Sequence, residues 1–189
     1  MDMPEIPKGI STRDLLLDFA PNLARQMMAE NKSAADLAGT VFTMLVDVSG
    51  TQYSYVVKDG TEMTAEEGGL DNPMVMVKIA EEDIHKMIEL QSLDMFMGAQ
   101  GDMDKSKYDA LVPLKGRLTA ALTNDDGSVM TTDVVFNGAD TPHLTLKMKT
   151  ADSIAVVKKE TNPINLFMSG GLQMEGDMGF AMTLQPIFG

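Results

Sequence analysis

The 189-residue chain contains no cysteine, no tryptophan and only two histidines. Without cysteine it can form no disulfide, no thiolate metal site and no cysteine nucleophile. Aromatic residues make up only 5% of the chain, so aliphatic side chains and methionine must supply the core. No apolar run approaches the roughly 18 residues that a membrane-spanning helix requires. The N-terminus also lacks the basic region and apolar core of a secretory signal, so we expect a cytoplasmic protein.

Positive charge is scarce, with 15 Lys and Arg against 28 Asp and Glu and a net charge of −13. This balance argues against nucleic acid as a partner. Residues 1–95 hold 17 acidic and 7 basic side chains, whereas residues 96–189 hold 11 and 8, giving net charges of −10 and −3. An anionic ligand head group would find its cations in the second half, although ordinary solvated lysines explain the same distribution.

Signals for catalysis or metal binding are weak. Neither His85 nor His143 has a partner at a metal-ligand spacing, and no serine-nucleophile, zinc-protease or phosphate-loop motif occurs. Residues 102–106 resemble the start of a calcium loop, but Lys107 and Pro113 stand where glycine and glutamate are required. We therefore expect no enzyme activity, no metal and no cofactor.

Methionine is abundant, with 18 residues, and four of them, Met168, Met174, Met178 and Met182, lie in the C-terminal stretch 162–189. Because methionine is a flexible apolar filler, such a segment suits either an ordinary core or a pocket for an apolar ligand. The candidate pocket residues are Leu166, Phe167, Met168, Met174, Met178, Phe180 and Met182, together with Met95 and Phe96 from the first half.

The chain contains segments that resemble one another in the same order. Each set reads as a strand hairpin with a closing Asp-Gly or Asn-Gly, then a strand and a helix. An internal duplication explains this order, although unrelated units of this kind also look alike. The matching segments are residues 39–60 with 116–138, 73–83 with 142–152, and 93–98 with 164–170.

Periodicity and capping residues predict the elements. Ser11 is a predicted N-cap of a helix that Pro21 either kinks or divides, and Thr150 is a predicted cap of a helix reaching Lys159. Asn162 and Pro163 begin a further short helix. Other helices are predicted at 34–37, from 81, at 93–98 and at 103–111, and strands at 41–48, 52–58, 62–65, 74–79, 116–123, 128–136 and 143–149. Residues 172–184 alternate as in a strand, but Gly176-Asp177 could instead end a strand and cap a helix.

The C-terminal part resembles the sterol carrier protein type two family. The resemblance lies in PHLTLKMK at 142–149, TADSIAVVKKE at 150–160 and NPINLFMSGGLQMEGDMGFAMTL at 162–184. It implies an α+β fold, in which a mostly antiparallel sheet is covered on one face by helices. It also implies a strand followed by a helix at the C-terminus. The chain departs from the family by inserting about seventy residues that begin again as a hairpin. Either two shortened units share one extended or duplicated sheet, or one unit is intact and the other decorates it.

The resemblance implies non-catalytic binding of a fatty acid, acyl-CoA or sterol-like lipid in a tunnel between sheet and helices. Transient membrane contact without stable insertion is compatible with it. An interaction or scaffold domain whose tunnel is filled by side chains is the alternative, and an acyl hydrolase or transferase is a third. The tunnel-lining residues implied are Leu166, Phe167, Met178, Phe180, Ala181 and Met182. The expected organisation is one continuous domain with a helical segment at 1–38 and sterol-carrier-like units at 39–115 and 116–189.

Overall fold

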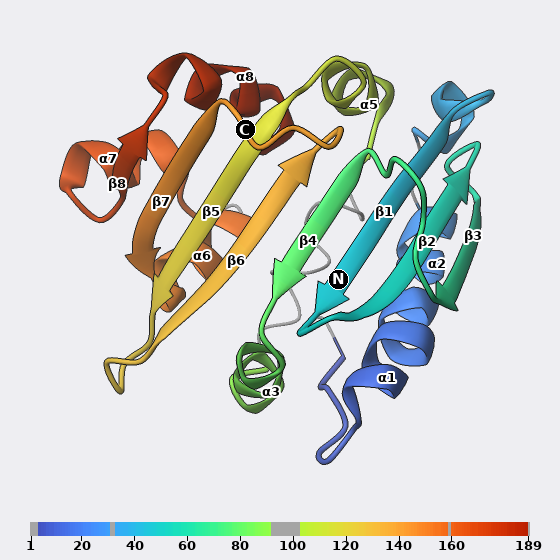
Figure 1. Cartoon of the computed structure of the whole chain (residues 1–189), viewed down its shortest axis with the longest axis horizontal. Helices are drawn as coiled ribbons and strands as arrows, with labels where there is room; N and C mark the ends of the chain where they lie inside the picture. Colours follow the sequence, from blue (N-terminus) through green and yellow to red (C-terminus); the bar gives the residue numbers. More distant parts are fainter. Residues whose placement is uncertain (1–3, 31–32, 92–102, 159, 189) are drawn as a thin grey trace.

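A computed structural model describes residues 4–30, 33–91, 103–158 and 160–188 (Figure 1). The strands are β1 Val41–Val48, β2 Thr51–Lys58, β3 Glu62–Glu67, β4 Val75–Ile79, β5 Gly116–Thr123, β6 Val129–Phe136, β7 His143–Lys149 and β8 Gln173–Gly176. The helices are α1 Thr12–Asp14, the π turn η1 Leu15–Phe19, α2 Ala20–Glu30, the 3-10 turn η2 Ala34–Leu37, α3 Glu81–Glu89, α5 Lys105–Leu111, α6 Thr150–Val157, α7 Pro163–Ser169 and α8 Met178–Phe188. The predicted helix at 93–98 lies outside the described residues.

The strands form one eight-stranded sheet in the order β3-β2-β1-β4-β6-β5-β7-β8. Its strand pairs are antiparallel except β1 with β4 and β5 with β7, which are parallel. Figure 1 looks onto the uncovered face, and α2 and α6 lie behind the sheet. The predicted α+β class, with a mostly antiparallel sheet and helices on one face, is confirmed.

The two halves of the sheet have the same connections. In each half, the first strand of a hairpin also pairs in parallel with a later strand, which leads directly into a helix. The hairpin β1–β2 is followed by β4 and α3, and the hairpin β5–β6 by β7 and α6. The N-cap residues of these helices, Ala80 and Lys149, even have the same ψ of 148°. The halves meet where β4 pairs antiparallel with β6.

The N-terminal helical run continues through Pro21. Ser11 caps it as predicted, because its side chain accepts a hydrogen bond from the Asp14 backbone N–H at 3.0 Å. The π turn η1 comes just before the proline, with the Ala20 N–H donating to the Leu15 carbonyl. A proline has no N–H to donate and its ring crowds the carbonyl four residues earlier. The wider π turn accommodates this proline without ending the helix.

The core lies between the sheet and the helices. Alternate residues of each strand face it, and the helices α2, α3 and α8 contribute side chains from one face. Inside it, the Tyr55 hydroxyl of β2 donates to the Leu16 carbonyl at 2.8 Å, and burial raises the pKa of this phenol far above its usual value. Among the least exposed core side chains are Leu15, Val46, Val48, Ile84, Phe136 and Leu144.

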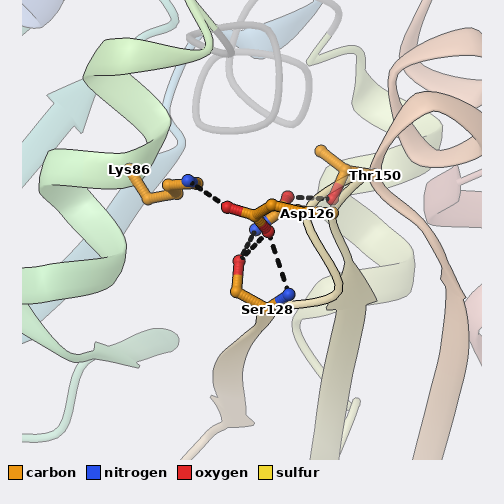
Figure 2. Close-up of polar contacts among 5 residues, drawn as sticks. Lys86, Asp126, Ser128 and Thr150 are labelled. Atoms are coloured by element: carbon orange, nitrogen blue, oxygen red, sulfur yellow. Dashed lines mark hydrogen bonds and ion pairs between the residues drawn. The ribbon is translucent and has the colours of Figure 1, made fainter.

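A polar chain joins α3 to the start of α6 through the turn between β5 and β6 (Figure 2). Lys86 Nζ lies 2.6 Å from Asp126 Oδ2, and Asp126 Oδ1 accepts hydrogen bonds from both the backbone N–H and the hydroxyl of Ser128. Asn124 donates to Ser128 and accepts from the Thr150 hydroxyl at 2.6 Å. The prediction that Thr150 caps its helix is therefore wrong, because this hydroxyl bonds Asn124 and the N-cap position belongs to Lys149.

Replacing Asp126 by asparagine tests this chain through its pH dependence. The Lys86 ammonium and the Ser128 donors hold the pKa of Asp126 well below its usual value, so folding favours the carboxylate. The carboxylate therefore contributes stability above the unfolded pKa of about 4, and the contribution is lost as pH falls below that value. We expect the melting temperature of Asp126→Asn to be lower than that of the wild type at pH 5 to 7, and the difference to shrink below about pH 4.

The exposed neighbour Asp125 provides the control, since Asp125→Asn removes the same charge from the same turn. An identical pH profile for the two variants would contradict a specific role of Asp126.

Candidate functional site

The short helix α7 forms as the sequence predicts. The Asn162 side chain accepts from the Asn165 backbone N–H at 2.8 Å, and Pro163 is the first helical residue. Gly170 ends the helix with a φ of 78°, a left-handed conformation in which glycine is unstrained. None of its side chains is fully buried, so the helix rests lightly on the rest of the molecule.

The apolar residues of α7 mostly point to solvent. Phe167 and Ile164 are exposed, and Met168 is 81% exposed. Because residues three and four apart lie on the same side of a helix, these three side chains form one exposed apolar face. Leu166 is half-buried on another side, next to Gly171. Of the predicted lining residues on this helix, only Leu166 turns toward the protein.

The final segment is a strand followed by a helix, as the family resemblance implied. Met174 of β8 pairs with Leu146 of β7 and packs partly buried against the core. The chain then turns at Gly176, where a Cβ atom would lie 2.3 Å from the His143 carbonyl oxygen, so only glycine fits. Asp177 caps α8 by accepting from the Phe180 backbone N–H at 2.8 Å. The strict alternation over residues 172–184 was therefore misleading.

Phe180 is the anchor of α8. It is 3% exposed, and its ring packs edge to face on Phe136 with centroids 6.3 Å apart. The ring lies over Gly116, where an added Cβ would come within 2.7 Å of it. Leu184, one turn later, is also buried. The glycine at the start of β5 thus makes the space that the Phe180 ring fills.

Two other predicted residues of α8, Met178 and Met182, face outward. Met182 is 73% exposed, and Met178 is also exposed, one helical turn before it. Ala181 packs partly buried against the core. The structure therefore divides the predicted set into a buried group around Phe180 and Met174 and two exposed faces on α7 and α8. Met95 and Phe96 lie outside the described residues.

The cations predicted for a ligand head group include side chains of β5, β7 and α5. Lys147 of β7 pairs with Glu175 at 2.7 Å on the neighbouring strand, and Lys105 pairs with Asp109 on its own helix. Arg117 lies in β5 with its Nε atom buried and without a hydrogen-bond partner among the described residues. Two of these cations are thus neutralised by nearby carboxylates.

Signs of a catalytic or metal centre are weak in the part of the chain that the structure describes. No group of three or more metal-ligating side chains occurs among those residues. His85 Nε2 lies 3.3 Å from Glu81 Oε1 on the surface of α3, and His143 Nε2 lies 2.9 Å from the Thr119 hydroxyl. Both contacts are ordinary hydrogen-bond or ion-pair geometries for a histidine.

One apolar cavity was not predicted from the sequence. It has a volume of about 30 Å³ and lies between α2, η2, the strands of the N-terminal half of the sheet, and α5 with Met103 just before it. Its walls include Met28, Met63 and Met103, which are scattered along the sequence and belong to no visible motif. These methionines can be recognised as cavity residues only from the folded structure, in which they come together.

Truncating Phe180 tests the packing of α8. We expect Phe180→Ala to lower the free energy of unfolding by about 3–5 kcal/mol, since it removes a buried ring and leaves a cavity over Gly116. The matched change Met182→Ala, on the exposed side of the same helix, is expected to stay within about 0.5 kcal/mol of the wild type. Urea titration of both variants measures the difference, and equal losses would contradict the packing described for α8.

Comparison with known protein families gives one match, in the C-terminal part of the chain. Residues 99–189 match the model of the SCP-2 sterol transfer family. No curated protein matches the chain. The family match supports binding or transfer of sterols or other lipids in general terms.

Three solved structures of sterol carrier proteins are also similar. Sterol carrier protein 2 like 2 of Aedes aegypti is 10% identical, with 91% of this chain and 95% of that chain covered and a TM-score of 0.28. Sterol carrier protein 2 of Yarrowia lipolytica is 12% identical, with 96% and 99% covered and a TM-score of 0.22. Sterol carrier protein domain 2 of Helicoverpa armigera is 13% identical, with 95% and 92% covered and a TM-score of 0.30. These TM-scores are low, so the three structures carry no argument, and the likeness to the SCP-2 sterol transfer family rests on the sequence match over residues 99–189.

Proposed function

We propose that the protein binds a long-chain apolar ligand, such as a fatty acid, an acyl-CoA or a sterol-like lipid, without chemical change. The observation that carries this proposal is the family match over residues 99–189, the region that contains the exposed apolar faces of α7 and α8. Exposed apolar side chains that gather on a surface mark contact with an apolar partner. An acyl chain offers about 0.8 kcal/mol for each methylene it buries there.

The ligand would lie between the sheet and the helices of the C-terminal half. Phe180, Leu184 and Ile187 hold α8 against the sheet, whereas α7 buries no side chain. Elements with few buried contacts open at low free energy. We therefore assign α7 as the element that moves to admit the chain, with Leu166, Phe167 and Met168 turning onto the ligand.

An interaction or scaffold domain is the second candidate, because the buried Phe180 ring occupies space that a ligand could otherwise use. The bulk of Phe167 and Met168 does not serve this purpose, since both side chains are exposed. The two candidates differ in whether apolar ligand enters at all. A protein that carries no lipid when purified and binds none in solution would be an interaction domain.

We further propose that the chain is one domain of two sterol-carrier-like units, 39–115 and 116–189, preceded by the helical segment 1–38. The identical strand connections of the two halves support an internal duplication. The capped helices α5 and α8 support it too, since Asp104 and Asp177 each accept from the backbone N–H three residues later. A cytoplasmic location and no enzymatic activity complete the proposal.

Transient contact with a membrane surface fits the same apolar faces. No helix of the described residues is long and apolar enough to cross a bilayer. Exposed phenylalanine and methionine on short helices can instead enter the interface between head groups and acyl chains. Met168, Met178 and Met182 are the side chains assigned to this contact.

Lipid binding is tested with the purified chain by native mass spectrometry and by titration with a fluorescent fatty acid. We expect bound lipid in the native spectrum and a dissociation constant in the micromolar range. The double variant Phe167→Gln and Met168→Gln is expected to weaken binding roughly tenfold, since it removes two apolar contacts. Val112→Gln with Val129→Gln, which changes two exposed apolar residues elsewhere, is the matched control. Equal affinities of the two double variants would contradict the assignment of α7.

A further inference from the structure

The apolar cavity of the N-terminal half is built by the fold of that half. Gly60 follows β2 with a φ of 65°, and a Cβ there would lie 2.6 Å from Leu37 Cδ1. The missing side chain lets the buried Leu37 pack directly on this turn and form one wall. Met28 of α2 and Met63 of β3 form others. The turn at Gly60 and flexible methionine side chains thus border the same space.

Strand registers show how this cavity relates to the C-terminal half. Val48 of β1 pairs with Ile79, and Leu122 of β5 pairs with Met148. Ile79 and Met148 each stand just before the N-cap residue of the following helix. Val48 and Leu122 therefore occupy equivalent positions in the two halves.

Six positions earlier, Phe42 of β1 is equivalent to Gly116 of β5. In the C-terminal half, the space over that position is filled by Phe180, the third residue of α8 after its Asp177 cap. The third residue after the Asp104 cap of α5 is Lys107, which has no apolar ring to insert. In the N-terminal half, the aromatic ring at this position is the side chain of Phe42 in β1 itself. The cavity lies next to this ring.

The cavity walls favour an apolar occupant over water. A buried water needs two to four polar partners. The Thr40 hydroxyl in the wall already donates to the Leu37 carbonyl at 2.7 Å. The Tyr108 hydroxyl donates to the Val41 carbonyl at 3.3 Å and accepts from the Val41 N–H at 3.4 Å, so it also has protein partners. The remaining wall is mostly aliphatic, aromatic and thioether groups.

We propose that this cavity is a second ligand site, which takes the end of an unbranched alkyl chain. A volume of about 30 Å³ exceeds the roughly 10–15 Å³ that one water needs, so the cavity holds a few chain atoms as it stands. Methionine side chains can rearrange around a longer chain. Of the described wall residues, eight precede the family-matched region, and Met103 and Tyr108 lie within it. None of these wall residues belongs to α7 or α8, so this site is distinct from the one proposed there.

The probe is a series of 1-alkanols from ethanol to hexanol, followed by NMR of methyl-labelled methionine in the full chain. We expect saturable shifts of the Met28 and Met63 methyl signals, identified with Met28→Leu and Met63→Leu variants. The affinity should rise about fourfold for each added methylene and level off once the cavity is full. Linear, unsaturable shifts shared by all methionines would overturn the proposal.

A cavity-filling variant provides the control. Ala24 is buried in the wall, so Ala24→Leu is expected to abolish the saturable shifts at Met63. Ala24→Val is the milder variant if leucine prevents folding. Loss of the Met63 response with unchanged signals from Met178 and Met182 supports a site in the N-terminal half. Saturable shifts confined to Met178 and Met182 would sink this proposal and leave the function proposed for α7 and α8 intact.

Discussion

The antiparallel pairing of β4 with β6 is the contact on which the rest of the molecule depends. It runs from Val75 opposite Phe136 to Ile79 opposite Thr132, and it joins the two half-sheets into one. Without it, both strands would present unpaired backbone groups along an edge. Asn137 extends the joint, since its N–H donates to the Met74 carbonyl. Its side-chain amide donates to the Leu114 carbonyl at 2.7 Å, which ties the loop after α5 to the same point.

This pairing explains how a repeated pattern can yield one body with one core. Each half brings a hairpin, a parallel strand and a helix, but neither half closes its sheet alone in this arrangement. β6 covers the edge of β4 much as β8 covers the edge of β7, antiparallel in both cases. The second half therefore supplies a strand at the place where the first half has none of its own. Lys86 and Asp126 connect the same two halves at the end of α3.

Local signals in the sequence were sufficient for most elements. Alternating apolar residues located the strands, and Ser11, Asn162 and Gly170 marked helix ends by the bonds and backbone angles that the structure contains. The alternation over residues 172–184 wrongly indicated one long strand. The strand ends at Gly176 and Asp177 caps a helix, and hydrophobic periodicity alone takes no account of such strand-ending and capping residues. The family resemblance succeeded there because it includes the glycine and the cap.

The site was harder to predict, because burial depends on residues far away in the sequence. The sequence around Phe180 and Met182 does not indicate that the phenylalanine is buried and the methionine exposed. Phe180 is buried because its ring lies over Gly116, which has no side chain and is far away in the sequence. Aligning the two repeated segments at Gly39 and Gly116 also hides the relation, because the strand ladders equate Gly116 with Phe42. Such a register is set by pairing across the sheet.

The two halves differ in which element supplies the aromatic ring at this position. In the C-terminal half the ring is Phe180 of α8, and in the N-terminal half it is Phe42 of β1. With Phe180 seated over Gly116, the C-terminal half gains packing, and its apolar surplus appears on the outside of α7 and α8. With Phe42 on the strand and Lys107 on the helix, the N-terminal half keeps internal space. Close packing and an open cavity are alternatives at one position, because a filled space stabilises the fold and an empty one can receive a ligand. A fold with two similarly connected halves can hold both at once, one in each half.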